Sequence, residues 1–232
     1  MTATRVVPLD ALDLRYAPRP WPFAEDRRGE IDAYFAGQRR QKPALWNGRM
    51  LLLHAWTLDG RVLRGDFLET DFASYLAWRD WGFPDAGVTC CFAQNALRAA
   101  DGAFLLGVMG AHTAGAGRIY FPSGTPDPGD VRGSAVDMHA NALRELAEET
   151  GLTPDDVAVA PGWHAVISGP RIALMKALTA AEPAAPLRER ILRHLARQAT
   201  PELADIRIVR GASDLDPMMP AFIVAFLGEM WK

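Results

Sequence analysis

The feature that most constrains the fold is an acidic segment, residues 137–152, that has the pattern of a helix with defined ends. Asp137 is a residue type that caps helix N-termini, and Gly151 is the type that most often ends a helix. At 100° per residue, glutamates at i, i+3 and i+4 fall on one side. The opposite side is a narrow apolar stripe suited to packing on a sheet, formed by Leu143, Leu146, Ala147 and Thr150. The pattern predicts a helix over 138–150.

The three glutamates of this helix are Glu145, Glu148 and Glu149. Like charges at these spacings repel, so the bare cluster destabilises its own helix. A hard divalent cation among the oxygens removes this conflict, and Mg²⁺ keeps waters that phosphate oxygens can replace. Arg144, one turn before Glu148, is placed to orient that carboxylate. The alternative is a solvated acidic face, since glutamate is a good helix former and is usually exposed. The arginine, the terminal glycine and the apolar opposite face favour the metal site.

Residues 144–152, Arg-Glu-Leu-Ala-Glu-Glu-Thr-Gly-Leu, also match a family signature. They resemble the second half of the Nudix box, which marks hydrolases of a nucleoside diphosphate linked to another moiety. Every fixed position of that half is present, from the arginine to the final leucine.

The first half of the box departs from the family pattern. A glycine fourteen residues before the arginine and a glutamate eight residues before it are replaced by Asp130 and Val136. The nearest substitutes are Gly124 and Asp137. With Gly124 as the loop glycine, the loop that precedes the helix is six residues longer than usual.

The resemblance implies an α/β fold, the Nudix-type α/β/α sandwich with a mixed sheet. It implies an enzyme, a pyrophosphohydrolase that uses Mg²⁺ or Mn²⁺ to cleave a nucleotide sugar, ADP-ribose or a similar small nucleotide. Glu145, Glu148 and Glu149 would be the metal ligands, and catalysis would rest on Glu145, Glu148 and Arg144. Glu145 is either a ligand or the base that orients the nucleophilic water. A backbone carbonyl near Ser123 and Gly124 would complete the metal shell.

Several roles stay open in the sequence. Many relatives use a further acidic residue outside the box, for which Glu182, Glu189 and Glu202 are candidates or simply surface glutamates. His139 could approach a phosphate or be a surface histidine. The arginines of a basic helix either face an anionic substrate or solvent (Arg188, Arg190, Arg193 and Arg197). The degraded first half of the box leaves a second function, a Nudix-fold sensor or regulator that binds a nucleotide without cleaving it.

Composition excludes some classes of partner and site. A net charge of −3 with 23% charged residues gives no reason to expect nucleic-acid binding, which normally needs a basic face. The two cysteines, Cys90 and Cys91, are adjacent and point to opposite faces of a strand, so neither a bridge nor a zinc site is expected. No segment has the apolar run of a signal peptide or a membrane span, which predicts a cytoplasmic protein with no membrane partner. The resemblance, with an aromatic-rich N-terminal part, suggests a homodimer.

The pattern changes to short strands at Val88. The resemblance implies a Nudix domain over 88–232, which leaves residues 1–87 as an N-terminal extension. The proline-rich residues 1–23 predict an irregular arm, and Asp59-Gly60 predicts a hairpin of strands 49–57 and 61–68. The other expected elements, in chain order, are helix 24–41, a helix from a Thr70 cap through Trp81, strands 88–97, 103–109 and 119–121, loop 125–135, strands 158–168 and 171–178, linker 180–186, helix 187–198, strand 206–209 and helix 222–231.

Overall fold

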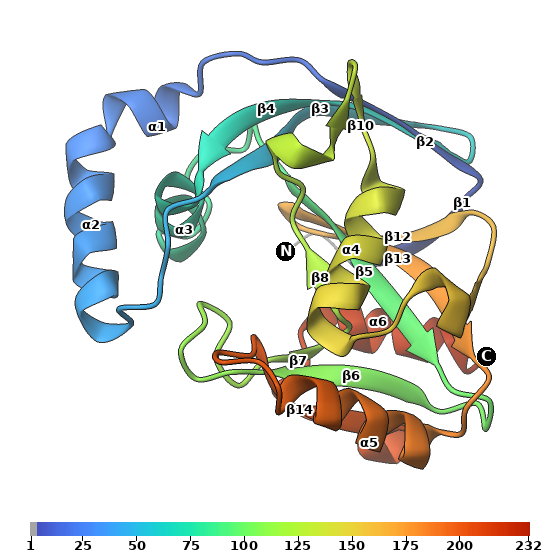
Figure 1. Cartoon of the computed structure of the whole chain (residues 1–232). Coiled ribbons are helices and arrows are strands. Elements are labelled where there is room, and N and C mark those ends of the chain that lie inside the picture. Colours follow the sequence, from blue (N-terminus) through green and yellow to red (C-terminus); the bar gives the residue numbers. More distant parts are fainter. Residues whose placement is uncertain (1–3) are drawn as a thin grey trace.

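A computed structural model describes residues 4–232 and shows two sheets with helices around them (Figure 1). The strands of the larger sheet are β1 (Arg5–Leu9), β5 (Cys90–Arg98), β6 (Phe104–Met109), β7 (Ile119–Tyr120), β8 (Ser123–Gly124), β11 (Val157–Val159), β12 (Trp163–Ser168), β13 (Arg171–Ala180) and β14 (Leu203–Val209). Its order is β1-β12-β13-β5-β6-β14, with β11 beside β13, β7 beside β6 and β8 beside β5. The sheet is mixed, because β13 runs parallel to β5 and the other pairs are antiparallel.

The smaller sheet joins the N-terminal part of the chain to the segment that precedes the acidic helix. Its strands are β2 (Ala11–Tyr16), β3 (Arg49–Asp59), β4 (Val62–Asp71), β9 (Val131–Arg132) and β10 (Ala135–Val136). The order is β3-β4-β2-β10-β9, and β3 and β4 form the hairpin that Asp59-Gly60 predicts.

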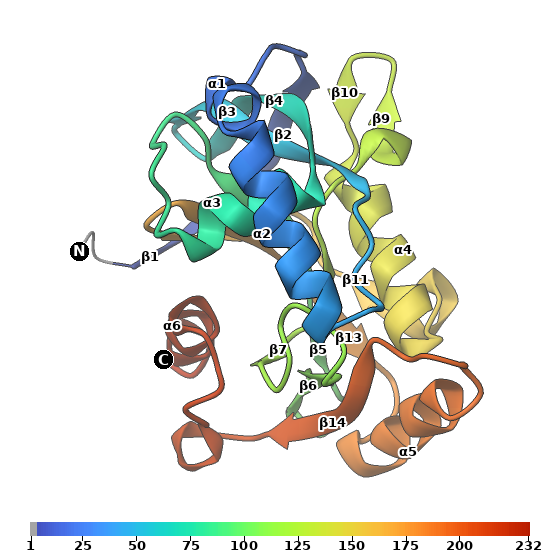
Figure 2. The same ribbon diagram turned by 90° about the vertical axis from the view of Figure 1, so that its left-hand side faces the viewer.

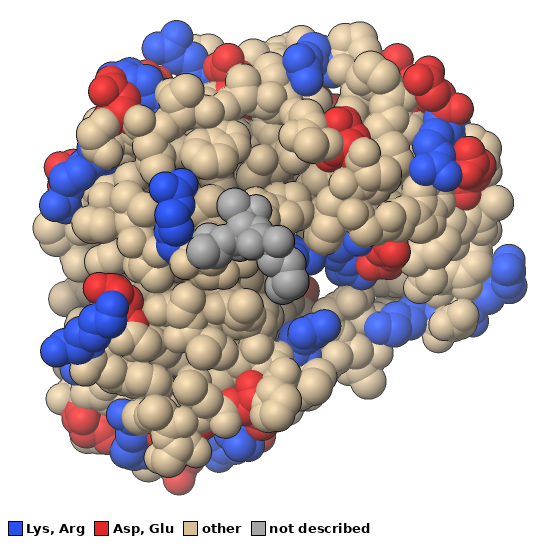
Figure 3. Space-filling model, turned by 180° about the vertical axis from the view of Figure 1, so that it is seen from behind, with Lys and Arg blue, Asp and Glu red and all other residues tan. Residues whose placement is uncertain are grey.

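The described helices are α1 (Pro22–Asp26), α2 (Arg28–Gln41), α3 (Phe72–Asp80), α4 (Met138–Thr150), α5 (Ala184–Leu195) and α6 (Ala221–Met230), with 3₁₀ turns at Pro128–Asp130, Pro154–Asp156 and Ala212–Asp214. Figure 2 shows α2 and α3 together on one side of the molecule, where they share a small apolar core. None of the helices in residues 4–232 is long and apolar enough to span a membrane. Acidic and basic side chains are interspersed on the face shown in Figure 3.

Strand β13 shows how the larger sheet is covered on both faces. Ile172 and Leu174 pack in one core with residues of α4, whereas Ala173 and Met175 pack in another with residues of α6. Because successive side chains of a strand point to opposite faces, α4 and α6 lie on opposite sides of the sheet. This arrangement confirms the predicted α/β/α fold with a mixed sheet.

The prediction of an irregular arm over residues 1–23 is wrong for most of its described part. Residues 5–9 form β1, which pairs antiparallel with β12, and residues 11–16 form β2. Pro8 is compatible with a strand because β1 is the edge of its sheet, where one side needs no ladder hydrogen bond. Residues 1–3 lie outside the described part of the chain.

Three other boundaries differ from the sequence prediction. Asp71, and not Thr70, caps α3, because its side chain accepts a hydrogen bond from Ser74 N at 2.8 Å. The expected loop 125–135 contains a 3₁₀ turn and the β9 strand of the β9–β10 pair. The expected linker 180–186 is mostly regular, since β13 extends to Ala180 and α5 begins at Ala184.

The two predicted parts of the chain are closely joined. Strand β1 from the predicted extension belongs to the larger sheet, and β2 pairs with β10 from the predicted domain. One apolar core combines Leu14 and Leu53 with Met138 and Leu174. The division near residue 87 therefore stays a prediction about the sequence, and the two parts share sheets and core.

Candidate active site

Helix α4 begins and ends where its sequence predicts. The Asp137 carboxylate accepts hydrogen bonds from the backbone amides of His139 at 3.1 Å and Ala140 at 2.9 Å. Gly151 ends the helix with φ 70°, a left-handed conformation that glycine adopts without steric cost. A Cβ at this position would also collide with the His194 ring. These two ends fix which residues of α4 face the rest of the molecule.

The turn of Ser123 and Gly124 lies directly against the acidic residues of α4. Strand β8 pairs with the middle of β5 and presents its backbone to the helix. Ser123 N donates a hydrogen bond to Glu149 Oε2 at 2.9 Å. A Cβ added to Gly124 would overlap the Glu145 carboxyl group. The absence of a side chain at Gly124 thus allows the Glu145 carboxyl group to approach this backbone closely.

Replacing Gly124 with alanine is expected to displace the Glu145 carboxyl group. Its φ lies outside the left-handed region, so the added methyl group acts through its collision with Glu145 alone. We expect a loss of catalytic activity of at least ~10²-fold, since a small misplacement of reacting groups has this effect. The free energy of unfolding should fall by about 1–3 kcal/mol from overpacking.

Gly29→Ala is the matched control, because a Cβ at Gly29 meets nothing within 4 Å. Steady-state rates and thermal unfolding of both variants test the prediction. Wild-type activity in the Gly124→Ala protein would contradict the placement of Glu145 in the site.

Arg144 forms ion pairs with several carboxylates, of which the sequence predicts only the pair with Glu148. Its guanidinium lies 2.8 Å from Glu145 Oε1 and 3.4 Å from Glu148 Oε2, so Glu145 is the closer partner. It also lies 3.3 Å from Oδ2 of Asp130, which is buried and accepts a second bond from Asn141 Nδ2 at 2.9 Å. Asp130 lies fourteen residues before Arg144, at the position of the family's glycine, and no pattern in the sequence predicts that it anchors Arg144.

The longer loop before the helix has a structural use. Its extra residues form the 3₁₀ turn that contains Asp130 and then β9, which pairs with β10 in the smaller sheet. The backbone amide of Asp130 donates a hydrogen bond to Asp127 O at 3.0 Å and closes the turn. The Asp130 carboxylate in turn accepts a hydrogen bond from the backbone amide of Asp127 at 3.0 Å. The insertion therefore links α4 to the N-terminal part of the chain.

The three glutamates of α4 occupy different environments, although one face was predicted for all of them. The Glu148 side chain is 59% exposed, the Glu145 side chain is 13% exposed, and Glu149 is 4% exposed. Burial raises the pKa of Glu145 to about 7, against the opposing effect of Arg144. Burial also raises the pKa of Glu149 well above its usual value, and the charges of Glu202 and Glu145 add to this rise.

Glu202 is the acidic residue outside the box that the fold brings to this site. It lies just before β14, where its backbone oxygen accepts a bond from Gly110 N at 2.8 Å. Its side chain is solvent-accessible but surrounded by the walls of a pocket, and this burial raises its pKa while His112 opposes the rise. Glu182 instead forms an ion pair with Arg190 at 2.8 Å, and Glu189 is exposed on α5. Sequence alone could not choose among the three.

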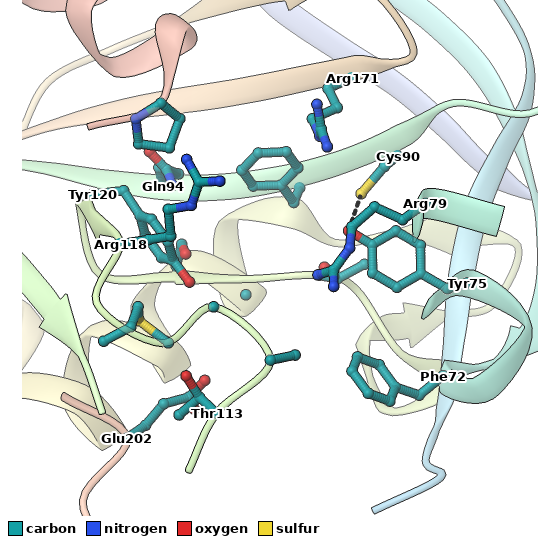
Figure 4. A pocket seen from close by; sticks show the side chains of 18 of the residues that line it. Phe72, Tyr75, Arg79, Cys90, Gln94, Thr113, Arg118, Tyr120, Arg171 and Glu202 are labelled. Carbon is teal, nitrogen blue, oxygen red and sulfur yellow. Dashed lines mark hydrogen bonds between the residues drawn. The ribbon is translucent and has the colours of Figure 1, made fainter. Parts of the chain in front are cut away.

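Glu145 and Glu202 line a pocket of about 1170 Å³ between the larger sheet, α3 and the start of α6. Figure 4 shows Arg79, Arg118 and Arg171 among the side chains that line it. Arg79 forms an ion pair with Asp80 at 2.7 Å, and the Arg171 guanidinium lies 4.7 Å from the centre of the Phe83 ring. Neither Arg118 nor Arg171 has an acidic partner within residues 4–232. The pocket thus combines carboxylates on one wall with guanidinium groups on others.

Two other groups considered from the sequence lie outside the pocket. His139 is exposed at the start of α4, and two arginines of α5 form ion pairs, Arg188 with Asp205 at 2.6 Å and Arg190 with Glu182 at 2.8 Å. Trp46, which is 81% exposed, lines the pocket, although nothing in the sequence distinguishes it from the other tryptophans. Cys90 and Cys91 are both free and buried.

The carboxylates have the chemistry of a site for a hard cation. Within the described residues, no three His, Cys, Asp or Glu side chains already converge as a metal shell. Oε1 of Glu149 is nevertheless buried without a hydrogen-bond partner, and the charge of Glu202 contributes to the raised pKa of both Glu145 and Glu149. A buried carboxylate oxygen is stabilised by a proton or a cation. These residues therefore fit Mg²⁺ or Mn²⁺.

Comparison with known proteins gives similar structures but no match in sequence. No model of a protein family and no curated protein matches the chain. A Nudix hydrolase from M. smegmatis, RenU, is 18% identical over 61% of this chain and 81% of its own, with a TM-score of 0.39. An Ap4A hydrolase from C. elegans is 17% identical over 60% and 89%, with a TM-score of 0.40. A MutT protein from Methanosarcina mazei Go1 is 18% identical over 62% and 96%, with a TM-score of 0.39.

At these identities and TM-scores the similar structures carry no argument about this chain, and the functional argument rests on the residues of the pocket.

Proposed function

We propose that this chain is a divalent-metal-dependent hydrolase that cleaves the diphosphate linkage of a nucleoside diphosphate derivative, such as a nucleotide sugar, ADP-ribose or a dinucleotide. The observation that most supports this proposal is the position of Glu145 and Glu149. Both lie against the backbone of Ser123 and Gly124, and Glu145 lines an arginine-containing pocket. Clustered carboxylates suit a cation and guanidinium groups suit phosphates. One cavity therefore offers groups for the metal ion and groups for the phosphates of such a substrate.

In this proposal Glu145, Glu148 and Glu149 would hold the metal ion, which would supply neutralisation of phosphate charge and a lowered pKa of a water molecule. Arg144 positions Glu145 through their 2.8 Å contact. Arg118 and Arg171 bind phosphate oxygens. Water attacks one phosphorus atom, the phosphorus–oxygen bond to the other phosphate breaks, and that phosphate leaves with the electron pair. The proton of the water passes to Glu202, whose raised pKa suits a general base.

Replacing Glu202 with glutamine is expected to lower the hydrolysis rate by about 10²–10⁴-fold, the usual contribution of a general base. Glu189→Gln is the matched control, because Glu189 is exposed on α5 and outside the pocket. Rates with Mg²⁺ over a range of pH give the comparison. Equal rates for the two variants would remove Glu202 from the mechanism.

A nucleotide-binding sensor without catalysis is the second candidate. Asp130 and Val136 at two positions of the box, and carboxylates that do not yet converge on one point, favour it. Glu148→Gln separates the two functions, because it should abolish turnover in a hydrolase and change only ligand affinity in a sensor. The cytoplasmic location and the homodimer remain predictions.

A further inference from the structure

The floor of the pocket is formed by alternate residues of β5. Cys90, Phe92 and Gln94 line the cavity. The residues between them face the other way: Cys91 and Ala93 belong to the core shared with α4. This alternation is the ordinary consequence of a strand with a buried side chain on each face. Gln94 is therefore the polar side chain of a floor that is otherwise apolar or sulfur-containing.

The amide of Gln94 has no partner within the described chain. The residue is fully buried, yet neither Oε1 nor Nε2 makes a hydrogen bond. Its neighbour Asn95 differs, because Asn95 Nδ2 donates to the backbone oxygens of Pro122 at 3.2 Å and Ala142 at 2.7 Å. An unpaired buried amide destabilises the fold, whereas leucine at the same position would not. Retaining glutamine here is explained if a ligand supplies the missing partners.

The surroundings of Gln94 suit a flat ring. Phe92 and Phe222 both line the pocket, with ring centres 5.5 Å apart at 74°. Figure 4 shows Gln94, Tyr120 and Arg118 in the same part of the cavity. The Gln94 amide is closed to solvent in this structure, so a ligand reaches it after a neighbouring side chain rotates. The Arg118 side chain, which Figure 4 shows near Gln94, is exposed and has no ion pair within residues 4–232, so it is free to rotate.

We propose that Gln94 selects the base of the substrate, by pairing its amide with an edge of a nucleobase that presents a hydrogen-bond donor beside an acceptor. The inference rests on the proposed function, which brings a nucleoside diphosphate derivative into this pocket. An amide donates and accepts at adjacent atoms, so it forms two bonds with such an edge. The carboxylates and arginines of the pocket bind the phosphates in any nucleotide. The order and position of the donor and the acceptor differ among the bases, so one base pairs best with this amide when the rest of the pocket holds the sugar and phosphates.

The test is calorimetric binding of ADP, GDP, UDP and CDP, with Mg²⁺, to the full chain and to two variants. The wild-type protein should prefer one base, and Gln94→Leu should lose that preference by about 5- to 150-fold, the worth of one bidentate pair. Its melting temperature should stay unchanged or rise, because no hydrogen bond within the protein is lost. Gln94→Glu, which only accepts, should shift preference toward GDP, since guanine presents two adjacent donors.

Equal affinities of the wild-type protein for all four nucleotides would overturn the inference, and so would an unchanged ranking in Gln94→Leu. If Gln94→Leu does not fold, Gln94→Met provides the same comparison with an unbranched side chain. Hydrolysis is measured separately on the wild-type protein. Base selection lost in the variants without any wild-type turnover would leave Gln94 assigned and refute the hydrolase. Turnover by the wild-type protein, with an unchanged base ranking in the variants, would support the hydrolase and refute the role of Gln94.

Discussion

Glu149→Gln should lower hydrolysis and raise stability in the same protein. Glu149 is 4% exposed, and its Oε1 has no partner, so the metal-free fold retains a carboxyl group in an unfavourable place. Glutamine still accepts the hydrogen bond of Ser123 N and removes the charge. We expect the free energy of unfolding of the metal-free protein at pH 8 to rise, because an unpaired buried amide costs less than an unpaired buried carboxylate. Hydrolysis should fall at least ~10²-fold, because a proposed metal ligand is lost.

Denaturant unfolding in EDTA and steady-state rates in Mg²⁺ give the two measurements. Glu189→Gln is the control, because it removes an equal charge from the surface of α5. The opposite signs are the diagnostic feature, since a merely structural glutamate would lose stability when replaced. A less stable Glu149→Gln protein that retains full activity would contradict the proposed role.

The metal-free protein should lose stability as pH rises from about 4.5 to about 7. Burial raises the folded-state pKa of Glu145 from 4.5 to about 7, so the folded state binds more protons than the unfolded chain in this window. Stability then falls with increasing pH until the folded carboxyl group has ionised. At 1.36 kcal/mol per pKa unit, Glu145 contributes a loss of about 3 kcal/mol. Glu149 acts in the same direction.

Other groups act on the same curve, so the wild-type protein is compared with Glu145→Gln. Burial lowers the pKa of His164, and this group makes the fold more stable as pH rises through its unfolded value of 6.5. The difference between the two proteins cancels that contribution. Thermal unfolding in EDTA at several pH values between 4.5 and 8 should show the curves diverging as pH rises. Parallel curves would mean that Glu145 is not buried as a neutral group.

Local patterns predicted the acidic helix. The cap at Asp137 and the stop at Gly151 both follow from residue types at short spacings. The hairpin at Asp59-Gly60 is of the same kind. Each depends on the conformational preferences of a few neighbouring residues, which one sequence reveals.

The features that the sequence did not predict depend on contacts between residues that are distant along the chain. Strand β1 forms because Val6 and its neighbours find an edge at β12, more than 150 residues away. Asp130 reaches Arg144, and Glu202 reaches the pocket, only through the folded arrangement of the sheet. Helical periodicity also placed Glu149 on one face with Glu145 and Glu148, whereas the turn at Ser123 covers Glu149. None of these contacts has a local signal.

The measurement that tests the central claim most directly is product release by the purified protein in Mg²⁺ and in EDTA. The substrates are UDP-glucose, ADP-ribose, diadenosine polyphosphates, NADH, coenzyme A and the nucleoside triphosphates, with Glu148→Gln as the inactive control. We expect cleavage of a diphosphate linkage in at least one substrate, dependent on the metal and absent in the variant. No release from any substrate, with one ligand still raising the melting temperature, would contradict the hydrolase and leave the nucleotide-binding sensor.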